Sequence, residues 1–341
     1  MCSMKVFRMK TDKNRYDRQI RVPQIGLAGQ EKLTNSRVLI VGCGALGTYA
    51  AEQLTRAGVG HLFLIDPDIV EKSNLQRQAL FTTADVKFSH FKVFAAREAL
   101  LAINPEVTIT ARNESFEHTL FDDFGKLDLV LDCTDNFLAR ELINEFCLHH
   151  DLPFVFASAA GTSGQVMALK PRFGPCLSCI FPDLIELERN CETIGVVTSL
   201  IPLISGIEVS LALQILVAPS AVDWETMHIV ENWPLNFAQF TIKKQKSCPC
   251  CSHDFSVSTD RNLRVERSCG GVYQSTLTHF NLEKFEQFCQ MKQWDLKSNS
   301  LVLLVKFEHY EITIFRKGRI LFYHFEEEKV AQKIFEQIIN L

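Results

Sequence analysis

The sequence has no large excess of charge of either sign. Its 36 lysine and arginine residues are nearly balanced by 40 aspartate and glutamate residues, which gives a formal net charge of −4 at pH 7. Proteins that bind a nucleic-acid duplex or a membrane surface usually present a broad positive field to it. We therefore expect no nucleic acid and no membrane among the main partners, and a small protein or a metabolite instead.

The sequence also begins without an apolar segment. Residues 1–16 are polar and basic, whereas a secretory signal peptide would have an apolar core there. We therefore expect a cytoplasmic location, where the 12 cysteines would be free thiols or metal thiolates rather than disulfides. There is no internal repeat and no low-complexity tract in the sequence.

No apolar run is unbroken over the length of a membrane span. The longest, residues 196–218, is interrupted by Pro202, Gly206, Glu208 and Gln214. A transmembrane helix needs about 20 consecutive, predominantly apolar residues with few polar ones among them. This run therefore predicts a buried or interface helix.

Strand-like runs alternate with helical patterns through the first half of the chain. We expect strands at residues 38–41, 62–65, 107–111, 127–131 and 154–157, and helices at residues 45–57, 92–103 and 139–149. Such alternation is typical of parallel βαβ units. The later segments 165–169 and 237–242 are shorter and alternate in polarity, which predicts antiparallel strands added to the same sheet. The fold class is therefore α/β, with a Rossmann-like mixed sheet.

The pattern changes near the end of the main domain. We expect one domain over residues 1–254, a polar linker at residues 255–262 and a small α+β domain over residues 263–341. The small domain should contain helices at residues 282–291 and 328–339 and strands at residues 301–307, 311–315 and 319–325.

Three glycines mark a candidate phosphate site. Gly42, Gly44 and Gly47 directly follow the first strand and begin a helix. Glycines let backbone amides approach phosphate oxygens closely, and the helix N-terminus supplies further N–H donors. Asp66 ends the second strand, about 20 residues further on, where an acid can accept hydrogen bonds from ribose hydroxyls. These features alone are equally consistent with an NAD-dependent oxidoreductase.

Two CxxC pairs form a candidate metal site. Cys176 with Cys179, and Cys248 with Cys251, could together bind one tetrahedral zinc ion, with each pair contributing two thiolates from a tight turn. Such a zinc knuckle would tie the end of the main domain to its middle and stabilise the fold. Cys250 leaves the choice of ligands in the second pair open, and four unrelated thiols are the alternative.

The segment after Asp66 distinguishes between nucleotide-binding classes. Residues 66–78 resemble the signature of the ThiF/MoeB/HesA family, which is related to ubiquitin-activating enzymes, and residues 15–20 and 132–136 agree with it. A dehydrogenase has no use for this segment. The resemblance implies an adenylation domain that binds ATP and Mg²⁺, with these nucleotide-binding residues beside the glycines: Asp66, Asp68, Asn74, Arg77, Gln78, Lys92, Asp135 and Asn136.

The resemblance also implies roles for individual side chains. Arg77 should lie over the ATP phosphates, and Asp135 should be associated with the metal and the phosphates. Arg18 would reach the ATP of a neighbouring subunit, which implies a homodimer. Lys92 matches the lysine that neutralises the transferring phosphate, but the preceding stretch departs from the family pattern, so Lys87 is a competitor.

Cys191 matches a position where some relatives carry a reactive cysteine. A neighbouring helix N-terminus could lower the pKa of such a thiol. The alternative is a small buried hydrophobic residue, which is the common fate of cysteine.

The implied function is adenylation of a small protein. By resemblance, the C-terminal glycine carboxylate of a ubiquitin-like sulfur carrier ending in Gly-Gly attacks the α-phosphate of ATP, and a sulfurtransferase or cysteine desulfurase then supplies sulfur. A MoaD-like carrier for molybdopterin and a ThiS-like carrier for thiamine both fit. The alternatives are a catalytically degenerate scaffold of the same family and the NAD-dependent oxidoreductase. No role for the C-terminal domain follows from the sequence.

Overall fold

The computed structural model describes residues 14–181, 195–248, 250–251, 265–267, 272–276, 281–298, 302–315 and 319–339. The chain divides into two compact units. The described residues up to 251 belong to the first unit and those from 265 onward to the second. Each unit has its own hydrophobic core.

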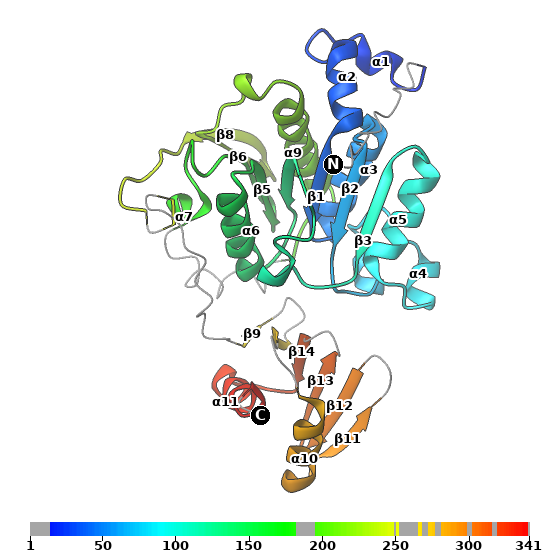
Figure 1. Ribbon diagram of the computed structural model, residues 1–341, viewed down its shortest axis with the longest axis vertical. Helices are drawn as coiled ribbons and strands as arrows, with labels where there is room; N and C mark the ends of the chain where they lie inside the picture. The colour runs from blue at the N-terminus through cyan, green and yellow to red at the C-terminus, as the bar shows by residue number, and fades with distance from the viewer. Residues whose placement is uncertain are drawn as a thin grey trace, which may run out of the picture. The chain divides into compact units, whose positions relative to one another are not determined.

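The first unit is built on an eight-stranded sheet with the order β3-β2-β1-β4-β5-β6-β7-β8 (Figure 1). Its strands are β1 (Arg37–Val41), β2 (His61–Ile65), β3 (Thr108–Arg112), β4 (Leu129–Asp132), β5 (Phe154–Ala160), β6 (Ser163–Leu169), β7 (Thr226–Asn232) and β8 (Leu235–Thr241). The first five are parallel, and β6, β7 and β8 are added antiparallel. This mixed sheet confirms the expected fold class.

Helices cover both faces of this sheet. The strand β1 alternates between two cores, because Val38 and Ile40 belong to one cluster while Leu39 and Val41 belong to the other. The first cluster is completed by α3 (Ala45–Ala57), α5 (Lys92–Ile103) and α9 (Leu200–Val217), and the second by α6 (Phe137–His150). Burial on both faces explains why the central parallel strands β1, β2 and β4 are largely apolar, whereas the edge strand β3 is less buried and more polar.

The apolar run expected to be a buried helix forms α9. By length and composition α9 could cross a membrane. It packs instead against α3, β5 and β6. Its buried residues include Leu200, Ile204 and Ala212, and its exposed residues include the polar Ser210 and Gln214. Packing against the sheet accounts for the apolar character of this helix.

Short elements complete the first unit. They are α1 (Asp17–Ile20), α2 (Gly26–Asn35), η1 (Lys72–Asn74), α4 (Thr83–Lys87), η2 (His118–Leu120), α7 (Leu177–Ile180) and η4 (Pro219–Ala221).

The second unit is a six-stranded antiparallel sheet with two helices (Figure 1). Its elements are β9 (Glu266–Arg267), β10 (Tyr273–Thr276), α10 (Leu282–Lys292), β11 (Asp295–Ser298), β12 (Val302–Phe307), β13 (Tyr310–Phe315), β14 (Arg319–Tyr323) and α11 (Glu328–Ile339). Its core combines aliphatic and aromatic side chains, and Phe285, Phe322 and Phe335 are fully buried in it. Three more strands are present than the sequence predicted, because β9, β10 and β11 are short and polar.

The register of the large sheet brings three loops together. Val41 lies beside Ile65 on one side and Asp132 on the other, so β1, β2 and β4 all end at the same edge. The glycine loop, the segment beginning at Asp66 and the segment after Asp132 therefore meet at the carboxyl edge of the parallel strands. In open α/β sheets this edge is where ligands usually bind.

Candidate functional site

The three glycines of the loop after β1 have different surroundings. A Cβ atom at Gly42 would lie 2.6 Å from the carbonyl oxygen of Cys133, and one at Gly47 would lie 1.9 Å from that of Gly42. Only glycine therefore fits at these two positions. A Cβ at Gly44 would meet only the side-chain nitrogen of Gln78, at 3.8 Å. Gly44 is thus the position where a ligand could approach the backbone closely.

The helix that follows offers donors to an anion. Gly44 is the N-cap of α3 and has no side chain to accept hydrogen bonds from the first amides of the helix. Unpaired amides and the helix dipole favour negative charge at such an N-terminus. The loop and helix together can therefore bind phosphate oxygens.

Asp66, Asp68 and Lys92 form a connected group beside the loop. Asp66 Oδ2 accepts a hydrogen bond from the Cys43 amide at 2.7 Å, and Oδ1 accepts one from the Asp68 amide at 2.8 Å. The Lys92 ammonium lies 2.9 Å from Asp68 Oδ2 and 4.0 Å from Asp66 Oδ1. A buried cation and two carboxylates therefore adjoin the candidate phosphate site.

The charges of this group depend on one another. Burial raises the pKa of Asp66 to about 6, and the nearby Lys92 charge opposes the rise. Burial alone would lower the pKa of Lys92, but Asp66 and Asp68 outweigh it and raise that pKa above its ordinary value. Lys92 therefore stays charged throughout the physiological range.

Lys87, the competitor of Lys92, lies elsewhere. It ends α4, is exposed, and its ammonium lies 5.6 Å from the centre of the Phe88 ring. Of the two lysines, the structure brings only Lys92 to the group that contains Asp66.

The segment from Glu71 to Gln78 lies beside the glycine loop at Gly44. Asn74 is buried, and its Oδ1 accepts a hydrogen bond from the Glu71 amide at 2.9 Å, which caps η1. Arg77 donates to the Ser73 carbonyl at 2.9 Å. Gln78 is buried, and its Oε1 has no hydrogen-bond partner among the described residues. Buried oxygens usually accept a hydrogen bond, so this unpartnered oxygen beside Gly44 fits a site where a bound ligand would donate one.

The segment after β4 supplies an exposed carboxylate on a fixed loop. Asp132 is fully buried, and its Oδ1 accepts two hydrogen bonds from Thr134. Arg140, also buried, donates to the Thr134 carbonyl at 2.8 Å. Asp135 is exposed, and its charge contributes to the raised pKa of Lys92. Asn136 caps α6 by accepting a hydrogen bond from the Ala139 amide at 2.8 Å.

Arg140 is a residue that sequence reasoning missed. Its Nε lies 3.9 Å from Asp132 Oδ2, so it is the buried counter-ion beneath this loop. An arginine in the first turn of a helix is ordinary in sequence, and only the burial of Asp132 identifies its role.

Arg18 is not part of this group within one chain. It lies on α1 with 87% of its side chain exposed, and its Nε forms a salt bridge with Asp17 Oδ2 at 3.8 Å. Cys191 lies outside the residues that the structure describes.

The four predicted metal ligands converge. The sulfurs of Cys176, Cys179, Cys248 and Cys251 all lie within 4.8 Å of one another. Three of the separations are 3.9, 3.6 and 3.5 Å, which are too long for disulfides. Zn–S bonds of about 2.3 Å in a tetrahedron would place sulfurs about 3.8 Å apart. The four thiols therefore fit a zinc ion.

Cys250 does not belong to this set of four sulfurs. Its sulfur accepts a hydrogen bond from Ser178 Oγ at 3.0 Å. In the second pair, the sulfurs that converge with Cys176 and Cys179 are therefore those of Cys248 and Cys251.

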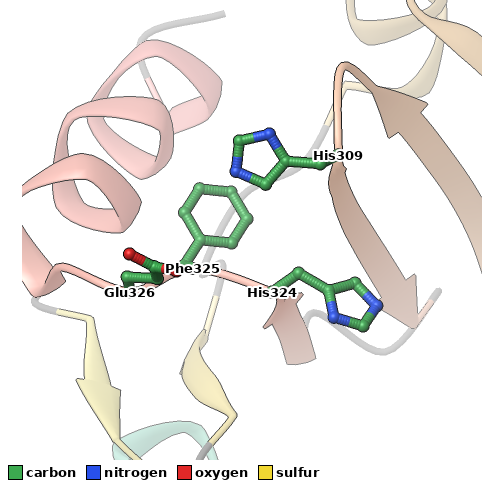
Figure 2. A pocket seen from close by; sticks show the side chains of 4 residues that line it. All are labelled: His309, His324, Phe325 and Glu326. Atoms are coloured by element: carbon green, nitrogen blue, oxygen red, sulfur yellow. The ribbon is translucent and has the colours of Figure 1, made fainter.

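The second unit has an open pocket of about 650 Å³ lined by His309, His324, Phe325 and Glu326. In Figure 2 the ring of His309 is directed toward Phe325, whereas His324 and Glu326 point away in opposite directions. The polar groups do not converge on a common point, and among the described residues only the cysteine cluster forms a candidate metal set. Nothing in this pocket indicates a reaction centre.

The fold and the site define a nucleotide-binding α/β domain with a cysteine cluster that fits zinc. Residues 16–250 match the ThiF family. The chain belongs to this family.

Two curated relatives are named sulfur carrier protein ThiS adenylyltransferase. The chain is 38% identical to the one from Escherichia coli strain K12, over 70% of this chain and 94% of the relative. It is 28% identical to the one from Bacillus subtilis strain 168, over 96% of this chain and 99% of the relative. The match to the Bacillus protein therefore includes the second unit.

A solved structure shares the fold. A crystal structure of E. coli MccB with ATP superposes with a TM-score of 0.62 at 20% identity, covering 70% of this chain and 75% of that chain.

Proposed function

We propose that this chain uses ATP to adenylate the C-terminal glycine carboxylate of a small ubiquitin-like sulfur-carrier protein. The observation that carries the proposal is the convergence of Gly44, Lys92 and Asp135 at one edge of the sheet, in a chain of the ThiF family. Relatives named for adenylation of ThiS support the same reaction. The enzyme is thus a nucleotidyltransferase.

A ThiS-like carrier is the first candidate substrate. The Bacillus relative named for ThiS matches nearly the whole of both chains, including the second unit. A relative named molybdopterin-synthase adenylyltransferase is 36% identical over 70% of this chain, so a MoaD-like carrier is the second candidate.

The protein contributes mainly by positioning the substrates and by stabilising the charge on the phosphates. The carrier carboxylate attacks the α-phosphate, and pyrophosphate leaves as the acyl-adenylate forms. Little covalent chemistry is asked of the side chains in such a transfer. The backbone at Gly44 and the N-terminus of α3 hold phosphate oxygens, and Lys92 and Arg77 neutralise the charge that develops on them.

The proposal includes further nucleotide contacts. Asp66 would accept hydrogen bonds from the ribose, and the unpartnered Oε1 of Gln78 would accept a hydrogen bond from the nucleotide. Asp135 would hold Mg²⁺, because a carboxylate together with phosphate oxygens suits this ion. The metal, when bound, neutralises phosphate charge. The side-chain carbonyl oxygens of Asn74 and Asn136 accept the hydrogen bonds that cap η1 and α6.

Exposed apolar side chains on the first unit support a protein as the partner. The edge strand β8 and the turn before it expose Trp233, Leu235 and Phe237, with exposed fractions of 75%, 62% and 59%. Large exposed apolar groups of this kind mark protein contacts. The proposal also includes a homodimer in which Arg18 completes the neighbouring site. It includes a sulfur-donating enzyme as a partner and a cytoplasmic location.

The test is a carrier-dependent reaction. Purified protein is mixed with ATP, Mg²⁺ and either a ThiS-like or a MoaD-like carrier, and both pyrophosphate release and the intact carrier mass are followed. Pyrophosphate release together with an adenylate mass on one carrier supports the proposal and selects the pathway. ATP binding without turnover on either carrier would favour the catalytically degenerate scaffold.

A further inference from the structure

One acidic side chain lies within an apolar helix beneath the site. Glu208 belongs to α9 and is fully buried. No other residue of α9 is charged. A carboxyl group buried without full hydrogen bonding costs free energy, so its presence among apolar residues requires a reason.

Glu208 contacts the segment that follows β4. The thiol of Cys133 donates to Glu208 Oε1 at 3.2 Å, whereas Oε2 has no hydrogen-bond partner among the described residues. Burial raises the pKa of Glu208 to about 8; the hydrogen bond from Cys133 opposes this rise and Asp132 adds to it. Near neutral pH the side chain is therefore mainly a neutral acid.

Cys133 in turn supports the glycine loop. Its carbonyl oxygen leaves no room for a Cβ at Gly42, and its own Cβ would lie 3.3 Å from a Cβ at Gly47. Asp135 follows Cys133 by two residues. Cys133 therefore contacts Glu208 and the glycine loop, and it belongs to the segment that carries Asp135.

Among the residues that the structure describes, no cation acts on Glu208 to neutralise it if it ionises. The two groups that act on it, Cys133 and Asp132, are both acidic. The strands β5 and β6 beneath α9 have no ionisable side chains. The other neighbouring elements carry these ionisable groups: Glu31 and Lys32 on α2, Cys43 on the glycine loop, and Tyr49, Glu52 and Arg56 on α3. Of their cations, Lys32 donates to the Val217 carbonyl and Arg56 pairs with Glu52.

We propose that Glu208 is a positioning residue of the nucleotide site that fixes both loops through its hydrogen bond with Cys133. This inference rests on the proposed function, because it concerns ATP binding by the same loops. Ionisation would place an uncompensated negative charge beneath the polyphosphate. ATP binding and ionisation of Glu208 therefore oppose each other, so ATP binding draws a proton onto Glu208 at alkaline pH.

The experiment measures the dissociation constant for ATP with Mg²⁺ by calorimetry across the ionisation of Glu208. The native chain is compared with Glu208→Gln, which keeps an oxygen for the Cys133 thiol but cannot ionise, and with Glu31→Gln, an exposed control on α2. We expect the affinity of the native chain and of the control to fall by up to about tenfold per pH unit above the ionisation. Glu208→Gln should lose most of this fall.

A second measurement needs no variant. Calorimetry of the native chain at alkaline pH, in two buffers of different ionisation enthalpy, should detect proton uptake on ATP binding. Equal pH dependence in native chain and Glu208→Gln, or no proton uptake, would overturn the positioning role. Failure of the native chain to bind ATP at any pH would instead contradict the proposed function, and this inference would fall as well.

Discussion

Lys92 is buried against two carboxylates, and this sets it apart from every surface lysine in the described chain. Its charge is held by Asp66 and Asp68 rather than by solvent. An anionic ligand can therefore meet a cation that is already oriented and largely desolvated, which strengthens their attraction.

Replacing Lys92 with methionine should lower the rate of adenylation by about 10²–10³-fold, as loss of one oriented donor does in other enzymes. Lys87→Met is the matched control, because Lys87 is exposed on α4. Carrier-dependent pyrophosphate release measures both. Equal losses in the two variants would contradict the assignment of Lys92.

Two glycines of the loop should respond differently to alanine. Gly47→Ala places a Cβ 1.9 Å from the Gly42 carbonyl oxygen and should destabilise the fold by about 1–3 kcal/mol, because the backbone must shift. Gly44→Ala meets only a flexible side chain, at 3.8 Å. It should keep the melting temperature and weaken ATP binding. Thermal unfolding and calorimetry separate the two effects, and unchanged ATP affinity in Gly44→Ala would count against the phosphate role of this backbone.

At the scale of an element, α6 begins where the Asp135 loop ends. Its N-cap, Asn136, is therefore part of the framework that holds this loop. The buried Arg140 of α6 donates a hydrogen bond to the Thr134 carbonyl in the same loop. A change at the start of α6 should thus affect both stability and the site.

Asn136→Ala removes the cap of α6 and should cost about 1 kcal/mol of unfolding free energy. Asn281→Ala is a matched control, because Asn281 caps α10 in the second unit by accepting from the Lys284 amide at 3.1 Å. Denaturant unfolding should give similar losses for both variants. Only Asn136→Ala should also lower adenylation, and an equal loss of activity in Asn281→Ala would refute the link between this cap and the site.

At the scale of the whole molecule, the cysteine cluster joins distant parts of the first unit. Cys176 and Cys248 are 72 positions apart in sequence and their sulfurs are 3.6 Å apart. Burial raises the pKa of the Cys176 thiol, so in the absence of a cation the thiol stays protonated. A bound metal would reverse this and hold the two segments together.

Metal analysis should therefore find one zinc ion per chain. Removal by a chelator, or Cys176→Ser, should lower the unfolding free energy on the order of several kcal/mol. Cys289→Ala, which removes a buried thiol of the second unit, should leave the zinc content unchanged. Full retention of stability after complete metal removal would show that the cluster is not a structural site.

The sequence by itself determined much of the local structure. The helices expected at residues 45–57, 92–103 and 328–339 have these same bounds in the structure. The β1 turn with its glycines and the two CxxC pairs were also identified from sequence. Periodicity, glycine content and short ligand spacing are local properties, so they can be interpreted without knowing the fold.

Only the tertiary structure decided which distant groups meet. It brought Lys92 rather than Lys87 to Asp68, brought the sulfur of Cys251 rather than that of Cys250 into the cysteine cluster, and placed Glu208 against Cys133 across 75 positions of sequence. It also formed β7, β9, β10 and β11, which the local pattern did not predict. Burial, the charge of a neighbour and the edge at which a strand ends all depend on long-range packing, and a local pattern does not specify them.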